Sequence, residues 1–164
     1  MSEVNREEFA MKFAWDDYSV TYKEVVESWL DEDAKKFTGC DDGFEEFYSY
    51  WVNEADTKPG ENFWAKIILK DKFPVGVLVL GLWENVFTVQ EYIISPSNRG
   101  KGIGSAALAE LLKESREILG KEIFEACAVI YPSNIPSQKA FEKAGFVFEP
   151  EHPDGDAWNY RYHK

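Results

Sequence analysis

Three apolar stretches joined by very short connections are the feature that most constrains the fold of this chain. They span residues 63–70, 75–83 and 86–95. All three are rich in the β-branched and aromatic residues that favour strands. The connections Asp71-Lys72 and Glu84-Asn85 are too short for the crossover that parallel neighbours require. These stretches therefore predict an antiparallel meander.

A helix and a further strand follow the meander. Pro96 and Asn98 end the third strand, and a helical pattern then runs to about residue 119, where Gly120 stops it. The apolar face of this helix holds Leu108, Leu111, Leu112, Ser115 and Ile118. A strand over residues 123–131 comes next, so a right-handed crossover is expected to join two parallel neighbours.

The end of the chain adds a helix and a hairpin. The helix begins near Pro136, whose missing amide hydrogen suits a first turn, and it ends at Gly145. Residues 146–148 and 158–162 predict the last hairpin. The complete pattern predicts an α/β fold with a mixed sheet, in which an antiparallel meander precedes a βαβ crossover and helices cover both faces. A length of 164 residues fits a single domain over residues 1–164.

The first 64 residues are strongly acidic and predict mainly helices. They hold 17 acidic and 6 basic residues, whereas the whole chain has a net charge of −12. Apolar residues recur there at helical spacing in two groups: Val25, Val26, Trp29 and Leu30, then Phe44, Phe47, Tyr48 and Trp51. Asp42 and Glu45 resemble a capping box at the start of the second group.

Composition excludes several classes of partner. The negative charge repels phosphate backbones, so no nucleic acid is expected as a partner. The longest apolar run, over residues 75–83, is far below the ~20 residues that cross a bilayer, so no membrane association is expected. Cys40 and Cys127 stand far apart, and His152 and His163 have no metal-ligand spacing. We therefore expect a cytoplasmic protein without a metal.

The segment Arg99-Gly100-Lys101-Gly102-Ile103-Gly104-Ser105 connects a predicted strand to a predicted helix. Glycines let backbone amides approach a ligand closely, and the first turn of a helix adds unpaired donors with partial positive charge. Such a turn can hold an anion, and a phosphate or pyrophosphate fits best. The alternative is a turn with a packing role alone.

Two common phosphate-binding motifs fit this segment poorly. A P-loop needs a glycine, four residues and then Gly-Lys-Ser/Thr, an order that is absent here. The dinucleotide motif Gly-x-Gly-x-x-Gly, counted from Gly100, ends at Ser105 instead of a glycine. It also follows the first strand of a parallel array, whereas this turn follows three antiparallel strands.

Two segments together resemble the GNAT superfamily of N-acetyltransferases. The run from Arg99 to Gly104 matches Gln/Arg-x-x-Gly-x-Gly/Ala, the pyrophosphate-binding motif of that superfamily. The run from Asn134 to Phe146 looks like its Asn-x-x-Ser/Ala and Glu-Lys-x-Gly-Phe helix. The resemblance is specific over residues 63–148, and residues 1–62 fit only in outline.

The resemblance implies a site for acetyl-CoA as the co-substrate. Amides of residues 100–104 would hold the pyrophosphate, and pantetheine would lie between the strands ending at residues 95 and 131. A bulge in the first of these strands would let amides near residues 92–94 polarise the thioester carbonyl. The residues expected to bind the cofactor are Tyr92, Ile93, Ile94, Arg99, Gly100, Lys101, Gly102, Ile103, Gly104, Ser105, Asn134, Ser137 and Phe141. Asn134 could equally be a simple helix cap.

Catalysis requires a group that removes a proton from the attacking amine. Glu91 is the candidate base, because relatives use acidic residues at that place in the strand. Many relatives protonate the leaving sulfur with a tyrosine where this chain has Phe141. Tyr131 is the candidate substitute, although a strand aromatic more often lies in the core.

The resemblance also implies that the early helices and the loop of the last hairpin line the acceptor groove. Both are acidic here: the first 64 residues, in which 31–33 and 41–42 are the densest acidic runs, and then Glu149, Glu151, Asp154 and Asp156. We therefore expect a cationic acceptor. A polyamine, an aminoglycoside-like amine, and the N-terminus or a lysine of a basic peptide all qualify. Acidic runs also serve simply as solvated faces. Two other functions stay open: an acyl-CoA sensor without catalysis, suggested by Phe141, and a dinucleotide-binding protein. Dimers are frequent in the superfamily, so a homodimer is also considered.

Overall fold

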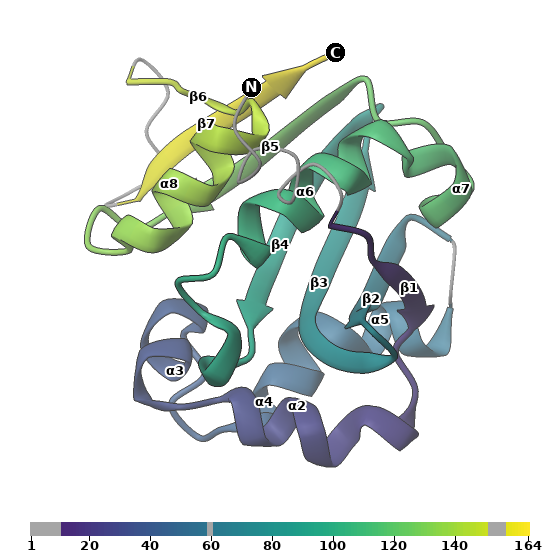
Figure 1. Cartoon of the computed structure of the whole chain (residues 1–164), viewed down its shortest axis with the longest axis vertical. Helices are drawn as coiled ribbons and strands as arrows, with labels where there is room; N and C mark the ends of the chain where they lie inside the picture. Colours follow the sequence, from purple (N-terminus) through teal and green to yellow (C-terminus); the bar gives the residue numbers. More distant parts are fainter. Residues whose placement is uncertain (1–10, 59–60, 151–156) are drawn as a thin grey trace.

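One mixed sheet organises the chain (Figure 1). The computed structural model describes residues 11–58, 61–150 and 157–164, and their strands form a seven-stranded sheet in the order β1-β2-β3-β4-β5-β7-β6. The strands are β1 (Ala14–Asp17), β2 (Phe63–Lys70), β3 (Phe73–Trp83), β4 (Val86–Ile94), β5 (Glu125–Ile130), β6 (Val147–Phe148) and β7 (Trp158–His163). Only the β4–β5 pair is parallel among these strands. The predicted fold class, meander and crossover are confirmed.

The two turns of the meander have the backbone conformation that hairpins favour. Asp71 and Lys72 have φ values of 51° and 73°, and Glu84 and Asn85 have values of 49° and 70°. Two successive residues with positive φ form the turn whose twist matches that of the flanking strands. The two-residue connections therefore fix β2, β3 and β4 as antiparallel neighbours.

Helices cover both faces of the sheet. The chain before β2 forms α2 (Lys23–Trp29), α3 (Glu32–Thr38), α4 (Phe44–Phe47) and α5 (Asn53–Thr57), with short turns η1 (Val20–Tyr22) and η2 (Tyr48–Val52). Their buried side chains pack on one face of β2 and β3, against residues such as Ile67, Val77 and Val79. The other face is covered by α6 (Ile103–Lys113), α7 (Ser115–Leu119) and α8 (Ile135–Ala144), which pack on residues such as Leu78 and Leu80. A short turn, η3 (Pro96–Asn98), links β4 to the glycine-rich segment.

Three local predictions are wrong in detail. The N-terminal part contains a strand, β1, which pairs with β2 although only four residues long. The helix expected up to residue 119 is divided at Glu114 into α6 and α7. The capping box is absent: α4 begins after Gly43 without a side-chain cap, and Asp31 instead caps α3 by accepting a hydrogen bond from the Ala34 amide. A cap depends on the side chain reaching a free amide, which spacing alone does not ensure.

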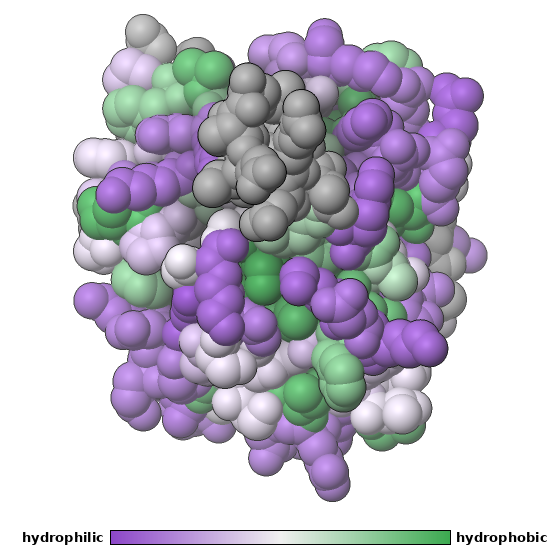
Figure 2. Space-filling model, viewed as in Figure 1, coloured by the Kyte–Doolittle hydropathy of each residue, from purple (hydrophilic) through white to green (hydrophobic). Residues whose placement is uncertain are grey.

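The described surface is mainly hydrophilic on the face drawn in Figure 2, with small hydrophobic areas between the charged side chains. Within residues 11–58, 61–150 and 157–164, no helix has the length and apolar character needed to span a bilayer.

Candidate functional site

A β-bulge at Gln90 determines which way the side chains of β4 point. In the register with β3, Val89 faces Leu80 and Glu91 faces Val79, so Gln90 is an extra residue on β4. Without an extra residue, positions 89 and 91 would share a face of the sheet. With it, Val89 packs beneath α6 and α8, whereas Glu91 lies opposite Val79 on the face covered by α2 to α5. The bulge implied by the family resemblance is therefore confirmed.

Beyond the bulge, β4 and β5 separate. The two strands pair through only three residue pairs, from Phe87 with Ala126 to Val89 with Ala128, and they then diverge (Figure 1). A cavity of about 670 Å³ fills the gap. Its walls come from residues 89–94 of β4, residues 128–131 at the end of β5, and the starts of α6 and α8, while α3 closes one end.

The glycine-rich turn forms one end of this cavity, which we call the glycine end. Gly100 and Gly102 have φ values of 76° and 79°, and a Cβ added to either would meet no atom within 4 Å. Gly102 precedes α6 without a side-chain cap, and the amides of residues 103–105 donate to no acceptor among the described residues. These free donors and the positive end of the helix dipole make the glycine end a suitable place for an anion.

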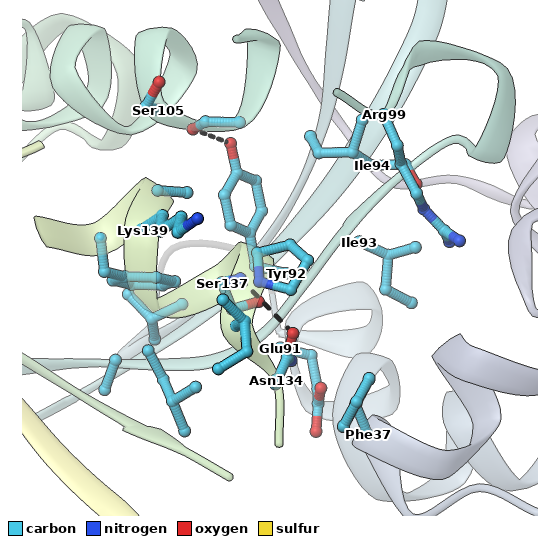
Figure 3. Close-up of a pocket in the computed structure, with 18 of the residues that line it drawn as sticks. Phe37, Glu91, Tyr92, Ile93, Ile94, Arg99, Ser105, Asn134, Ser137 and Lys139 are labelled. Atoms are coloured by element: carbon cyan, nitrogen blue, oxygen red, sulfur yellow. Dashed lines mark hydrogen bonds between the residues drawn. The ribbon is translucent and has the colours of Figure 1, made fainter. Parts of the chain in front are cut away.

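Tyr92 joins β4 to the first turn of α6. Its hydroxyl donates a hydrogen bond to the Gly104 carbonyl oxygen, with 2.6 Å between the oxygens, and burial raises the pKa of this tyrosine (Figure 3). The Tyr92 ring meets the Phe141 ring edge-on, with 6.1 Å between the centroids. Phe141 is only 3% exposed and packs in turn on Phe146. Phe141 therefore contributes shape to the cavity but no exchangeable proton.

Glu91 lies at the opposite end of the cavity from the glycines, close to α3. Figure 3 shows it beside Asn134 and Phe37, and all three residues line the cavity. Burial raises the pKa of the Glu91 carboxyl well above its ordinary value of 4.5, and no hydrogen bond or ion pair to another described residue opposes this shift. A carboxylate with a raised pKa and no partner is a suitable proton acceptor.

The start of α8 supplies a third wall. Asn134 caps this helix, because its Oδ1 accepts a hydrogen bond from the Ser137 amide at 3.4 Å (Figure 3). Asn134 and Ser137 both line the cavity. Gln138 fixes the preceding loop by donating from Nε2 to the carbonyl oxygens of Tyr131 and Pro132 at 3.1 and 2.7 Å. The capping role considered for Asn134 is present, and its position also leaves it facing the cavity.

Tyr131 lies at the mouth of the cavity and is not in the core. The strand predicted to reach residue 131 ends at Ile130, and the Tyr131 side chain is 47% exposed. Tyr131 is one of the residues that line the cavity.

The two basic side chains next to the glycines point elsewhere. Arg99 donates from Nε to the Ile94 carbonyl oxygen at 2.9 Å and from Nη1 to Asp31 at 2.7 Å, so its guanidinium is already engaged with protein groups. Lys101 is exposed and is not part of the cavity lining. Arg99 is nevertheless one of the residues that line the cavity, and two further basic residues, Lys139 and Lys143, line it one turn apart on α8.

The family resemblance implied that the early helices lie beside the acceptor, but it did not identify the residues. Asp33, Ala34, Phe37 and Thr38 line the cavity, on one face of α3. Only Asp33, within the acidic run 31–33, was named in advance, because the sequence there carries no motif. In the described part of the chain, no group of three or more His, Cys, Asp or Glu side chains could hold a metal ion.

Comparison with known proteins finds a family whose model matches most of this chain. Residues 11–146 match the model of the acetyltransferase (GNAT) family. Among curated protein sequences, none matches the chain significantly.

Solved structures share the fold. AAC(6')-Ib in complex with paromomycin and acetyl-CoA has a TM-score of 0.73 at 16% identity, over 93% of this chain and 94% of that one. PaiA N-acetyltransferase from Thermoplasma acidophilum in complex with coenzyme A has a TM-score of 0.66 at 18% identity, over 94% and 100% of the two chains. A chimera of spermidine N-acetyltransferase SpeG from Vibrio cholerae has a TM-score of 0.67 at 14% identity, over 92% and 95%.

Proposed function

Since the chain belongs to the acetyltransferase (GNAT) family, we propose that it transfers an acetyl group from acetyl-CoA to a primary amine of a cationic acceptor. The observation that carries this proposal is the set of unpaired amides at residues 103–105, which open onto the gap between β4 and β5. A long molecule with a diphosphate in its middle and a thioester at one end suits that arrangement, because the anion site and the Glu91 carboxylate lie at opposite ends of one cavity.

Acetyl-CoA fits the residues that are present. Gly100 and Gly102 leave open space where a side chain would obstruct a phosphate, and the amides of α6 can donate to it. On the side that faces β5, β4 beyond Val89 pairs with no strand of the described chain, so its backbone there can hydrogen-bond to the pantetheine amides. Lys139 and Lys143 add positive charge from α8. Arg99 instead holds the turn in place, since its guanidinium is engaged with Ile94 and Asp31 and its amide donates to the Pro96 carbonyl oxygen at 3.4 Å.

Acetyl-CoA, when bound, supplies an acyl group activated as a thioester. The amine nitrogen of the acceptor attacks the thioester carbon directly, a C–N bond forms and the C–S bond breaks. Glu91 accepts the proton that the amine loses, either directly or through a water molecule. Amides of residues 92–94 stabilise the negative charge that develops on the carbonyl oxygen.

The sulfur leaves without a buried acid beside it, because Phe141 has no proton to give. A thiol pKa of about 8.5 makes the thiolate a tolerable leaving group. Tyr131, exposed at the cavity mouth, is the candidate that returns a proton to it. The proposed reaction therefore depends more on Glu91, the base for the amine, than on a group that protonates the leaving sulfur.

A cationic acceptor suits the charge around the α3 end of the cavity. Asp33 and Glu91 line that end, and the first 64 residues hold 17 acidic against 6 basic residues. Lys139 and Lys143 line the wall formed by α8. This difference in charge orients a cationic amine toward α3 and the anionic coenzyme toward α6. The solved structures of AAC(6')-Ib with paromomycin and of spermidine N-acetyltransferase are consistent with such acceptors.

The test is an assay of purified protein with acetyl-CoA and a panel of amines that includes spermidine, kanamycin and a lysine-rich peptide. Release of free thiol only when an amine is present, with acetylated amine found by mass spectrometry, supports the proposal. Absence of turnover with every amine, despite saturable binding of acetyl-CoA, would support the second candidate. That candidate is an acyl-CoA sensor, and the buried Phe141 in place of an acid is the observation in its favour.

A further inference from the structure

Asp31 uses its two carboxylate oxygens for two different structural tasks. Oδ1 accepts a hydrogen bond from the Ala34 amide at 2.9 Å and caps α3. Oδ2 accepts a hydrogen bond from Nη1 of Arg99 at 2.7 Å, and the two side chains form an ion pair while 39% and 35% exposed. Desolvation acts to raise the pKa of Asp31, but the hydrogen bonds from Ala34 and Arg99 outweigh it and lower the pKa overall.

Arg99 connects this cap to the other side of the cavity. Its Nε donates to the carbonyl oxygen of Ile94, the last residue of β4, at 2.9 Å. Its backbone immediately precedes Gly100, the first glycine of the turn before α6. One guanidinium therefore links the end of β4, the glycine-rich turn and the start of α3, three segments that all line the cavity.

The helix α3 has few other attachments in the described structure. Only Ala34 and Thr38 among its seven residues are buried. A helix of this length is not stable by itself in water, so contacts outside it decide where it lies. The same helix presents Asp33 and Phe37 to the cavity, and Phe37 lies beside Glu91 (Figure 3).

We propose that Asp31 is a positioning residue that, through Arg99, holds α3 in place over the acceptor end of the cavity and thereby sets the affinity for the acceptor amine. By "acceptor end" we mean the end of the cavity at Glu91 and α3, so the inference rests on the proposed function. It goes beyond that function because it assigns a role to a residue outside the cavity lining. It also assigns Arg99, the first residue of the glycine-rich motif, a role other than contact with phosphate.

The first test compares Asp31→Asn with wild type. Asparagine keeps an oxygen that can cap α3 but removes the charge that Arg99 binds. With spermidine as the probe amine, or kanamycin if only that amine is turned over, we expect the acceptor KM to rise by about threefold at low salt. The kcat and the Kd for acetyl-CoA should stay within twofold of wild type. Hydrogen exchange of the α3 amides should be faster in the variant.

Glu54→Gln is the matched control. It makes the same change in net charge and breaks another exposed ion pair in the N-terminal part, between Glu54 and Lys58. A general electrostatic effect would raise the acceptor KM in both variants, whereas the proposal expects a change in Asp31→Asn alone. In a double-mutant cycle with Arg99→Gln, the effects on KM at saturating acetyl-CoA should be clearly less than additive.

An acceptor KM for Asp31→Asn equal to that of wild type overturns the inference, whether or not α3 exchanges faster. An equal rise in the KM of Glu54→Gln also overturns it. Both results leave the proposed function intact, because the wild type would still turn over. Failure of the wild type to bind acetyl-CoA is a different result: it removes the proposed function, and this inference with it.

Discussion

The hydroxyl of Tyr92 donates a 2.6 Å hydrogen bond to the carbonyl oxygen of Gly104. This bond ties β4, just past its bulge, to the first turn of α6, where the amides that open onto the cavity begin. The strand edge and the helix start are therefore held together as one unit. The Phe141 ring, edge-on to Tyr92, closes the space behind the bond.

Removal of the hydroxyl in Tyr92→Phe should loosen this unit without changing its shape. We expect a loss of about 1 kcal/mol in the free energy of unfolding, the usual net value of such a bond. The Kd for acetyl-CoA should rise by a few fold, because the α6 amides are less well fixed. Urea unfolding and calorimetric titration measure the two quantities, and unchanged affinity together with lost stability would show that the bond serves the fold alone.

Gly102→Ala tests the anion site. The positive φ of 79° costs alanine about 1 kcal/mol of stability, although its Cβ meets no atom in the protein. The added methyl group should project into the phosphate position and raise the Kd for acetyl-CoA by at least about tenfold. Gly120→Ala is the matched control, since Gly120 has a φ of 81° and equally open space but follows α7. Equal effects of both substitutions on the Kd would contradict the assignment.

Glu91→Gln should lower kcat by about 10²-fold to 10⁴-fold, the usual contribution of a general base. The activity of wild type should rise with pH as Glu91 loses its proton. Glu84→Gln, which removes an exposed carboxylate in the turn before β4, should behave as wild type. If Glu91→Gln keeps its kcat and the pH profile is unchanged, another group must be the base.

Glu91→Gln should also change the stability of the protein, in a way that depends on pH. Burial raises the pKa of Glu91 above its value in the unfolded chain, so the folded state favours the protonated form. The folded protein therefore loses stability as the pH rises through the raised pKa. Glu91→Gln should have a higher Tm than wild type at pH 8, and the difference should disappear below about pH 4, where both states bind the proton. A difference that is constant with pH would contradict the shift.

Asp33→Asn tests the preference for a cationic acceptor. The acceptor KM should rise about fivefold at low ionic strength and less in high salt, because added salt screens exposed charges. Glu32→Gln makes the same charge change on the adjacent residue of α3. Glu32 does not line the cavity between β4 and β5, so this variant should leave the acceptor KM unchanged. Equal effects would mean that only the overall charge matters.

Phe141→Tyr distinguishes an active acetyltransferase from an acyl-CoA sensor that has lost catalysis. We expect kcat to increase by less than about tenfold, because the thiolate already leaves without help at a pKa of about 8.5. An increase of a hundredfold or more from a nearly inactive wild type would show that the chain binds acyl-CoA with its catalytic acid lost.

Sequence patterns predicted the meander, the crossover and the glycine-rich turn, because each depends on local chemistry. Two-residue connections force antiparallel pairing, and glycines at residues 100 and 102 take positive φ. The strand β1 was missed because four half-exposed or exposed residues carry almost no apolar alternation. Its place in the sheet comes from pairing with β2, which is a tertiary contact.

The glycine end of the cavity was predicted more completely than the α3 end. Glycines and a helix start are readable in sequence, whereas the direction of the Arg99 side chain depends on Asp31, 68 positions away. The orientation of Glu91 depends on one extra residue in β4, a property of pairing with β3. No motif marks the residues of α3 that form this wall, so only the folded chain reveals which of them do.

Calorimetric titration of the wild-type protein with coenzyme A, beside NAD as a competitor that also contains adenosine diphosphate, tests the central claim most directly. We predict saturable binding of one coenzyme A per chain, strongly weakened in Gly102→Ala, and no detectable binding of NAD. Absence of heat with coenzyme A, or binding of NAD in its place, would contradict the assignment of the cavity between β4 and β5.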